Sequence, residues 1–236
     1  MRQYAMHKPY QSIFFDADET LFHFNAQTCL ERSLEYLEIS YTNDELRQFR
    51  HTNQQLWQRY QRHEITMREL LDLRFAPLRE RSGLNTDTLS KIFFNEAVLC
   101  SELIPGASEL IKALSGKIPL VLLTNGFKDM QLPRLQKHGL ESCFDWVITS
   151  EEVGLPKPHR SMFDHAVAKL SNIPRSHILM VGDSLEADIL GGHQAELDTC
   201  WFNPSTKPRH SKIKPDYQVS CLHQLRVELG DLINEL

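Results

Sequence analysis

Three short apolar runs, each ending at a polar or glycine-containing turn, constrain the fold of this chain more than any other feature. The runs cover residues 13–15, 120–123 and 178–181. None alternates polar and apolar residues as a half-exposed strand does, so we expect three strands of a parallel sheet that helices cover on both faces. Residues 146–149 and 199–202 are weaker candidates for strands of the same sheet.

Helical patterns lie between and after these runs. The expected helices cover residues 107–114, 130–138, 161–170 and 187–195, and Gly139 follows the second of them, as glycine often follows a helix. A last segment places one apolar stripe at helical spacing, made of Leu222, Leu225, Leu229, Leu232 and Ile233. Strand and helix thus alternate in the second half of the chain, which predicts an α/β fold with a doubly wound parallel sheet.

Residues 23–100 have a different character. They contain long polar, helix-favouring stretches at 44–64 and 66–81, and no good strand candidate. We interpret this block as an all-helical insertion after the first strand. The expected domains are therefore an α/β core of residues 1–22 and 101–236, and a helical domain of residues 23–100.

The first apolar run leads into two carboxylates, Asp16 and Asp18. Side chains two residues apart in an extended chain point the same way, so these carboxylates are expected to lie close together. Close carboxylates repel each other, and a fold keeps such a pair with a cation or a shared proton. Ligands of an open parallel sheet bind beyond the carboxyl ends of its strands. Taken alone, however, the pair is equally compatible with two solvated loop residues.

Further polar groups follow the other strand ends. Thr124-Asn125-Gly126 follows the second run, and Asp183 follows the run at 178–181, with Asp188 five residues further on. A loop carries Lys157, and Pro158 after it favours an extended conformation of the lysine. Each group has an ordinary explanation of its own: a plain turn, a surface lysine, or a carboxylate at a helix N-terminus. Their occurrence at successive strand ends and in the following loop predicts one common site.

These motifs together resemble the four motifs of the haloacid dehalogenase superfamily. They read Asp16-x-Asp18-x-Thr20, Thr124-Asn125, Lys157-Pro158, and Gly182-Asp183-Ser184-x-x-x-Asp188. The resemblance covers nearly the whole chain, implies a Rossmann-like core, and makes the helical insertion similar to the superfamily's type 1 cap. Residues 14–22, 124–127, 150–154 and 179–192 further resemble one branch, the YjjG-type pyrimidine 5'-nucleotidases.

The resemblance implies an Mg²⁺-dependent phosphatase that hydrolyses small phosphomonoesters through an aspartyl phosphate. Asp16 would be the nucleophile, and Asp18 would first protonate the leaving oxygen and then deprotonate the attacking water. Asp16, the backbone carbonyl of Asp18, and Asp183 would bind Mg²⁺. Asp188 would steady the surroundings of the metal rather than bind it.

The resemblance also implies how the phosphate is held. Lys157, the Thr124 hydroxyl and the backbone N–H groups near Asn125 and Gly126 would bind the transferring oxygens. Thr20 would orient the nucleophile loop rather than contact the substrate.

The expected substrate is a pyrimidine nucleoside 5'-monophosphate, which follows from the branch and not from the residue pattern. The phosphate-binding motifs cannot recognise a leaving group, so the helical cap is expected to close over the strand ends and supply that recognition. Its aromatic residues could stack on a base or form the cap's own core, and they include Phe24, Trp57, Tyr60 and Phe75. Glu19 stands where most of the superfamily has glycine, but this branch tolerates an acidic residue there.

Four alternatives remain open at this point. A sugar-phosphate phosphatase or a phosphomutase would share every motif, and released phosphate separates the second from a phosphatase. A haloacid dehalogenase would not need an acid at Asp18, and a non-catalytic module would be expected to lack Asp16, Asp18 or Lys157.

Composition narrows the partners and the compartment. The chain has 236 residues, 26 basic and 31 acidic, with a net charge of −5, which does not favour nucleic-acid or membrane partners. The broken basic run between Lys207 and Lys214 reads as a solvated loop. Five scattered cysteines and a polar segment at 1–11 lead us to expect a cytoplasmic protein. No feature of the sequence indicates a particular oligomeric state.

Overall fold

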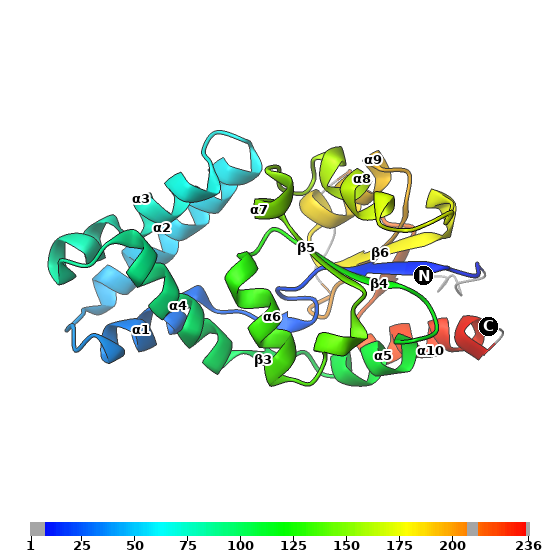
Figure 1. The fold of residues 1–236 in the computed structure, drawn as a ribbon, viewed down its shortest axis with the longest axis horizontal. Helices are drawn as coiled ribbons and strands as arrows, with labels where there is room; N and C mark the ends of the chain where they lie inside the picture. Colours follow the sequence, from blue (N-terminus) through cyan, green and yellow to red (C-terminus); the bar gives the residue numbers. More distant parts are fainter. Residues whose placement is uncertain (1–7, 207–211, 235–236) are drawn as a thin grey trace. The chain divides into compact units, whose positions relative to one another are not determined.

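The computed structural model describes residues 8–206 and 212–234, with the side chains from residue 231 onward left out (Figure 1). The start of the N-terminal segment and much of the basic run therefore lie outside the described residues, as do the side chains of Leu232 and Ile233 in the apolar stripe. The chain separates into two units, which we call the α/β unit (Met1–His23 and Glu102–Leu236) and the helical unit (Phe24–Ser101).

A six-stranded parallel sheet forms the centre of the α/β unit. Its strands, in chain order, are β1 (Ser12–Phe15), β4 (Leu120–Thr124), β5 (Trp146–Thr149), β6 (Ile178–Gly182), β7 (Asp198–Phe202) and β8 (Tyr217–Val219). They lie in the spatial order β5-β4-β1-β6-β7-β8, and all neighbours pair in parallel. This is a doubly wound order that changes direction between β1 and β6, the place where such sheets bind ligands. The predicted α/β fold class is confirmed.

Alternate residues of the central strands enter two separate hydrophobic layers. Ile13 and Phe15 of β1 belong to one cluster with α5 (Ala107–Leu114) and α10 (Leu222–Asn234), whereas Phe14 belongs to the other with α8 (Arg160–Ala168). Figure 1 shows α5 and α10 on one side of the sheet and α8 and α9 (Leu190–Gln194) on the other. All three residues are fully buried, which explains the lack of polar alternation in this run.

Several elements differ from the sequence expectations. The edge strand β8 was not predicted, because its central residue is Gln218 and it has no apolar run. The helix expected over 187–195 begins earlier, as a π-helical turn, η3 (Leu185–Ile189), before α9. Lys157 lies in a turn closed by a hydrogen bond from the His159 N–H to the Pro156 carbonyl (2.9 Å), and its peptide bond to Pro158 is cis. The extended conformation expected for the lysine stays a prediction.

The remaining elements of the α/β unit are short. The helices are α6 (Lys128–Lys137), α7 (Ser150–Val153) and the 3₁₀ turns η1 (Glu141–Cys143) and η2 (Arg175–His177). Two-residue strands β2 (Phe22–His23) and β3 (Glu102–Leu103) pair antiparallel. Their pairing brings together the two points where the chain leaves and re-enters this unit.

The helical unit consists of α1 (Ala26–Tyr36), α2 (Asn43–Gln61), α3 (Met67–Ser82) and α4 (Thr86–Cys100). Thr42 and Thr66 begin α2 and α3 with capping boxes, in which each threonine exchanges hydrogen bonds with a glutamate three residues later. These caps fix where the polar helices start, a signal that hydrophobic periodicity alone lacks. Within the described part of the chain, every helix is too short or too polar to span a bilayer.

Candidate active site

Three carboxylates meet at the point where the sheet changes direction. Asp16 directly follows β1, Asp183 follows β6, and Asp188 lies in the π-helical turn η3. One carboxylate oxygen from each lies within 4.8 Å of the others. Because β1 and β6 are paired in register, with Phe15 opposite Val181, the two strand ends deliver Asp16 and Asp183 to the same edge.

Lys157 is the cation at this cluster, and it is buried with 1% of its side chain exposed. Its Nζ donates to Asp16 Oδ1 (2.6 Å), Asp188 Oδ1 (2.7 Å) and the Leu123 carbonyl at the end of β4 (2.7 Å). Three acceptors satisfy the three ammonium donors. Lys157 therefore joins the ends of three segments that are distant in the sequence.

The one positive charge of Lys157 does not balance the three carboxylates of the cluster when all of them are ionised. Burial raises the pKa of Asp16 to about 7 although Lys157 acts to lower it, and the charges of Asp188 and Asp18 add to the increase. Burial and the charges of Asp16 and Asp188 raise the pKa of Asp183 to about 8. Burial alone would lower the pKa of Lys157, but the charges of Asp16 and Asp188 reverse the shift and raise it.

This donor set fits a hard divalent cation. Carboxylate oxygens are the ligands that Mg²⁺ prefers, and a further positive charge would relieve the repulsion between Asp16 and Asp183. Asp188 accepts from Lys157 through its Oδ1 (2.7 Å) and from the Ser184 N–H through its Oδ2 (3.0 Å). Asp188 thus holds Lys157 and the loop after β6 in place.

Asp18 lies apart from the three-carboxylate cluster, although it is only two residues from Asp16. Its Oδ1 accepts from Nη1 of Arg134 on α6 at 2.6 Å, and its side chain is 27% exposed. The guanidinium of Arg134 is completely buried and stacks over the Phe22 ring, with Cζ 4.3 Å from the ring centroid. The two carboxylates of the first motif therefore have different cationic partners.

Thr124 and Asn125 contact the protein itself in this structure. The Thr124 hydroxyl accepts from the Gly126 N–H (2.9 Å) and keeps its own proton for another acceptor. The Asn125 side chain accepts from the Lys157 N–H (2.7 Å) and donates to the Lys157 carbonyl (2.9 Å). Asn125 therefore fixes the backbone of the lysine loop, a task that its position after β4 did not reveal.

The loop between Asp16 and β2 is held by local contacts. Thr20 is buried and its hydroxyl donates to Asp16 Oδ2 (3.3 Å). Glu19 has a φ of 60°, in the left-handed region that favours glycine, and its N–H donates to the Phe22 carbonyl (2.7 Å). Glu19 is exposed, so its side chain points into solvent and has room in this conformation.

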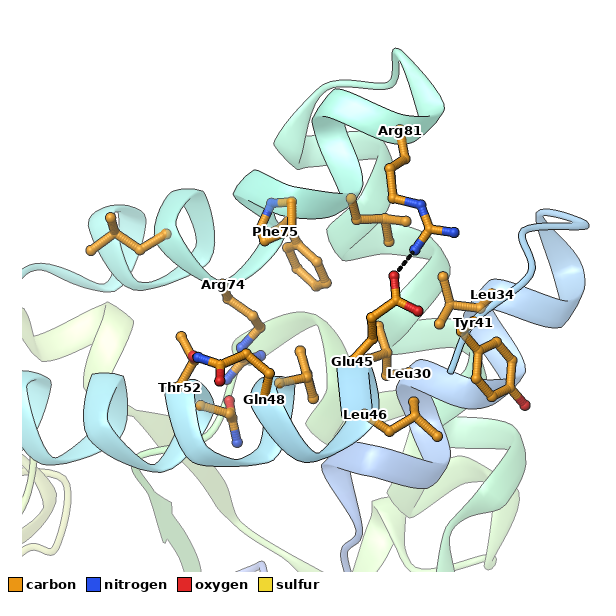
Figure 2. Close-up of a pocket in the computed structure, with 15 residues that line it drawn as sticks. Leu30, Leu34, Tyr41, Glu45, Leu46, Gln48, Thr52, Arg74, Phe75 and Arg81 are labelled. Atoms are coloured by element: carbon orange, nitrogen blue, oxygen red, sulfur yellow. Dashed lines mark hydrogen bonds and ion pairs between the residues drawn. The ribbon is translucent and has the colours of Figure 1, made fainter. Parts of the chain in front are cut away.

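The helical unit has a pocket of its own, with a volume of about 180 Å³, between α1, α2 and α3 (Figure 2). Its lining is mainly apolar, and Glu45 and Arg81 form an ion pair with each other there (2.7 Å). Phe75 lines it and is buried against Phe93, while Tyr60 is buried beside Trp57. Within the described residues, the cluster of potential metal ligands belongs to the α/β unit, so we place the chemistry there.

Sequence reasoning did not single out Arg134. The helix was expected, but its buried stripe contains Gln131 and Arg134 beside Met130 and Leu135. Polar residues at helical spacing within an apolar stripe are the signal that could have identified a buried charge there.

Three carboxylates and a buried lysine thus meet at the ends of the central strands, the place where open α/β sheets bind ligands. The sequence pattern of the haloacid dehalogenase-like hydrolases matches residues 10–196. The chain belongs to this family, and the resemblance inferred from the motifs is confirmed.

Three relatives extend the comparison over most of the chain. The pyrimidine 5'-nucleotidase YjjG of Escherichia coli is 41% identical over 90% of this chain and 95% of its own length. The pyrimidine 5'-nucleotidase PynA of Streptococcus pneumoniae is 29% identical over 92% of this chain and 93% of its own. The crystal structure of the HAD-hydrolase YfnB of Bacillus subtilis, bound to magnesium, has a TM-score of 0.82 at 33% identity, covering 94% of this chain and all of that one.

Proposed function

We propose that this protein is an Mg²⁺-dependent 5'-nucleotidase that hydrolyses pyrimidine nucleoside 5'-monophosphates through a phosphorylated Asp16. The observation that carries the proposal is the buried Lys157 bridging Asp16 and Asp188 beside Asp183. Such a cluster suits a dianionic phosphate and a divalent cation better than it suits a neutral or cationic substrate.

Asp16 is the nucleophile in this proposal. Its Oδ1 is held by Lys157 and its Oδ2 by Thr20, so the carboxylate has a fixed orientation at the end of β1. One carboxylate oxygen attacks phosphorus, the bond from phosphorus to the ester oxygen breaks, and an acyl phosphate forms on Asp16. In this proposal Lys157 exchanges one of its three present acceptors for a transferring oxygen, and the Thr124 hydroxyl donates to another.

Asp18 carries the proton in both half-reactions. It donates a proton to the departing ester oxygen, and later takes one from the water that attacks the acyl phosphate, which releases phosphate and restores Asp16. This role favours a phosphatase over a haloacid dehalogenase, since a departing halide needs no proton.

Asp16, Asp183 and the backbone carbonyl of Asp18 are the groups proposed to hold Mg²⁺. When bound, the ion neutralises the negative charge that phosphate adds to this acidic site. The raised pKa values of Asp16 and Asp183 support a cation here, because the buried carboxylates are otherwise undercompensated.

The pyrimidine substrate is supported by the similarity to YjjG and PynA, not by a contact in the site. Recognition of the leaving nucleoside is assigned to the helical unit, because the α/β motifs address only phosphate. Phe75 and Tyr60 are buried within that unit, so the half-buried Phe24 and Trp57 are the better candidates for stacking on a base. The five scattered cysteines are compatible with action in the reducing cytoplasm.

Phosphate release from a panel of nucleoside monophosphates and sugar phosphates tests the proposal. We expect Mg²⁺-dependent release with the highest kcat/KM on uridine, deoxyuridine and thymidine 5'-monophosphates. Ca²⁺ should not replace Mg²⁺, because it takes more oxygen ligands and can occupy both oxygens of the nucleophile. Asp16→Asn should abolish turnover while leaving the fold intact.

Other results of the panel separate the alternatives. Preference for a sugar phosphate would contradict nucleotide specificity, and conversion without released phosphate would indicate a phosphomutase. Near-normal activity of Asp16→Asn would exclude the covalent step.

A further inference from the structure

Asp18 is oriented by a buried cation on a different element, α6. Arg134 Nη1 donates to Asp18 Oδ1 (2.6 Å) and also contacts Gln131 Oε1 (3.4 Å) one turn earlier on the same helix. The guanidinium is fully buried, and Phe22, at the far end of the loop that carries Asp18, covers it at 4.3 Å. The arginine is therefore enclosed between α6 and the loop that it contacts.

The other oxygen of Asp18 is directed elsewhere. A Cβ atom added at Gly126 would lie 3.4 Å from Asp18 Oδ2, 3.2 Å from Thr124 Oγ1 and 2.6 Å from Gln131 Nε2. Asp18 Oδ2 therefore lies on the side of the Thr124–Gly126 turn, the turn that carries one of the proposed phosphate-binding groups. The two oxygens of Asp18 have distinct surroundings, one at a buried arginine and one at the proposed substrate site.

A guanidinium can only donate hydrogen bonds. With Arg134 occupying Oδ1, a proton carried by Asp18 is placed on Oδ2. A carboxylate tied through one oxygen also loses rotational freedom, and it is kept away from the Lys157 and Asp16 cluster two residues earlier. Without this contact, the carboxylate could turn toward Lys157 or toward a bound cation.

We propose that Arg134 is a positioning residue for proton transfer, which holds Asp18 through Oδ1 so that Oδ2 exchanges the proton with the leaving group and the water. The proposal rests on the proposed phosphatase function. In this proposal Arg134 acts on the reaction through the Asp18 side chain, to which it donates its hydrogen bond.

Leaving-group dependence provides the test. A nucleoside leaves as a poor alkoxide that needs a proton, whereas p-nitrophenolate leaves without one. For Arg134→Met we expect kcat/KM on uridine 5'-monophosphate to fall about 100-fold or more, and on p-nitrophenyl phosphate less than about 10-fold, in line with the usual size of general acid catalysis. Arg134→Lys, which keeps a donor and a charge, should lie between wild type and Arg134→Met.

A second arm places the same substitution in the Asp18→Asn background. If Arg134 acts through Asp18, Arg134→Met should there cause less than about a threefold further loss, because the single effects are not additive. Lys137→Met, which removes a cation from the exposed end of the same helix, is the matched control and should leave both substrates unaffected. Thermal unfolding of each variant verifies that it is folded. If Arg134→Met does not fold, Arg134→Lys replaces it in both experiments.

Equal losses on both substrates, or an undiminished loss in the Asp18→Asn background, would overturn the role of Arg134. In that event a wild type that still releases phosphate would leave the phosphatase function standing. A wild type that releases phosphate from neither substrate would instead contradict the function on which the inference rests.

Discussion

Lys157 shows how one side chain can organise a site from segments far apart in the sequence. It is almost completely buried and contacts the ends of β1 and β4 and the turn η3. A lysine is costly to bury, and here two carboxylates and a carbonyl compensate the cost. The same contacts that hold the lysine also keep the carboxylates from separating.

Replacing Lys157 by methionine should therefore affect both stability and activity. Two buried carboxylates would lose their cation, and we expect a loss of about 3–5 kcal/mol in the free energy of unfolding. Activity should fall by about 10²-fold or more, because a donor to the transferring phosphoryl group is removed. Denaturant unfolding and phosphate release measure the two effects.

The exposed Lys169→Met is the matched control and should change the free energy of unfolding by less than about 0.5 kcal/mol. Adding Asp188→Asn to Lys157→Met should recover part of the stability but none of the activity. A Lys157→Met variant as stable as the wild type would contradict the charge balance inferred for the cluster.

Asp183 gives the metal-free protein a predictable response to pH. Its pKa is raised to about 8 in the folded protein and is ordinary, about 4, in the unfolded chain. The folded state therefore binds the extra proton, and the stability that this provides is present below about pH 4 and lost as pH rises toward 8. Asp183→Asn removes this titration.

Without metal, we expect the wild type to lose thermal stability relative to Asp183→Asn as pH rises from 5 to 8. Adding Mg²⁺ at pH 8 should raise the melting temperature of the wild type more than that of the variant, because a bound ligand stabilises the folded state. A difference between the two proteins that is constant over this pH range would show that Asp183 titrates normally.

At the scale of elements, close packing between α8 and α9 sets the position of the lysine loop. A Cβ atom at Gly191 would lie 2.4 Å from Phe163 Cε2 and 3.1 Å from the Pro158 Cα atom. Gly191 is thus required by a close approach rather than by a turn. Pro158, the residue after Lys157, packs against Gly191, so the packing of α8 and α9 affects the loop that carries Lys157.

Gly191→Ala should destabilise the protein by about 1–3 kcal/mol through overpacking against Phe163. The double variant with Phe163→Leu should recover part of this loss, because the ring that meets the new methyl group is removed. Gly230→Ala is the control within α10: nothing lies within 4 Å of its added Cβ. That substitution should stabilise by up to about 1 kcal/mol through helix propensity. Chemical denaturation of all three variants measures these changes in the free energy of unfolding. A Gly191→Ala variant as stable as the wild type would contradict the packing argument.

At the scale of the molecule, the residues proposed for the chemistry all come from one of the two units. Asp16, Asp18, Thr124, Lys157 and Asp183 all belong to the α/β unit. The helical unit, Phe24–Ser101, has its own caps and its own buried aromatic residues. This separation allows specificity to change while the chemistry is kept.

A chimera in which an unrelated helical unit replaces Phe24–Ser101 should keep activity on p-nitrophenyl phosphate, within about tenfold, because the phosphate-binding groups are retained. It should lose the preference for pyrimidine over purine nucleotides. Steady-state kcat/KM values on p-nitrophenyl phosphate, a pyrimidine nucleotide and a purine nucleotide measure both effects. The same chimera carrying Asp16→Asn measures the background release of phosphate. Survival of the pyrimidine preference would assign nucleoside recognition to the α/β unit.

The local sequence pattern predicted most of the sheet, and the resemblance of the motifs predicted the family. The runs at β1, β4 and β6 are apolar on both faces, so their composition predicts that they are buried. Turn residues mark where each run ends. β8 was not predicted, because its own sequence has no strand pattern and it forms a strand by pairing with β7. The left-handed conformation of Glu19 was not predicted either, since it goes with a hydrogen bond from the Glu19 N–H to the Phe22 carbonyl.

The sequence by itself determined which groups are available for chemistry, because strand ends and their polar residues follow from the chain's own pattern. It could not determine which groups pair, since hydrogen bonds between residues 31 to 141 positions apart depend on how the strands and helices pack. Only the tertiary structure placed Lys157 between Asp16 and Asp188, turned Asn125 toward the lysine backbone, and brought Arg134 to Asp18. Burial in the fold is also the main cause of the raised pKa values of Asp16 and Asp183, because a carboxylate's pKa depends on the water and the charges around it.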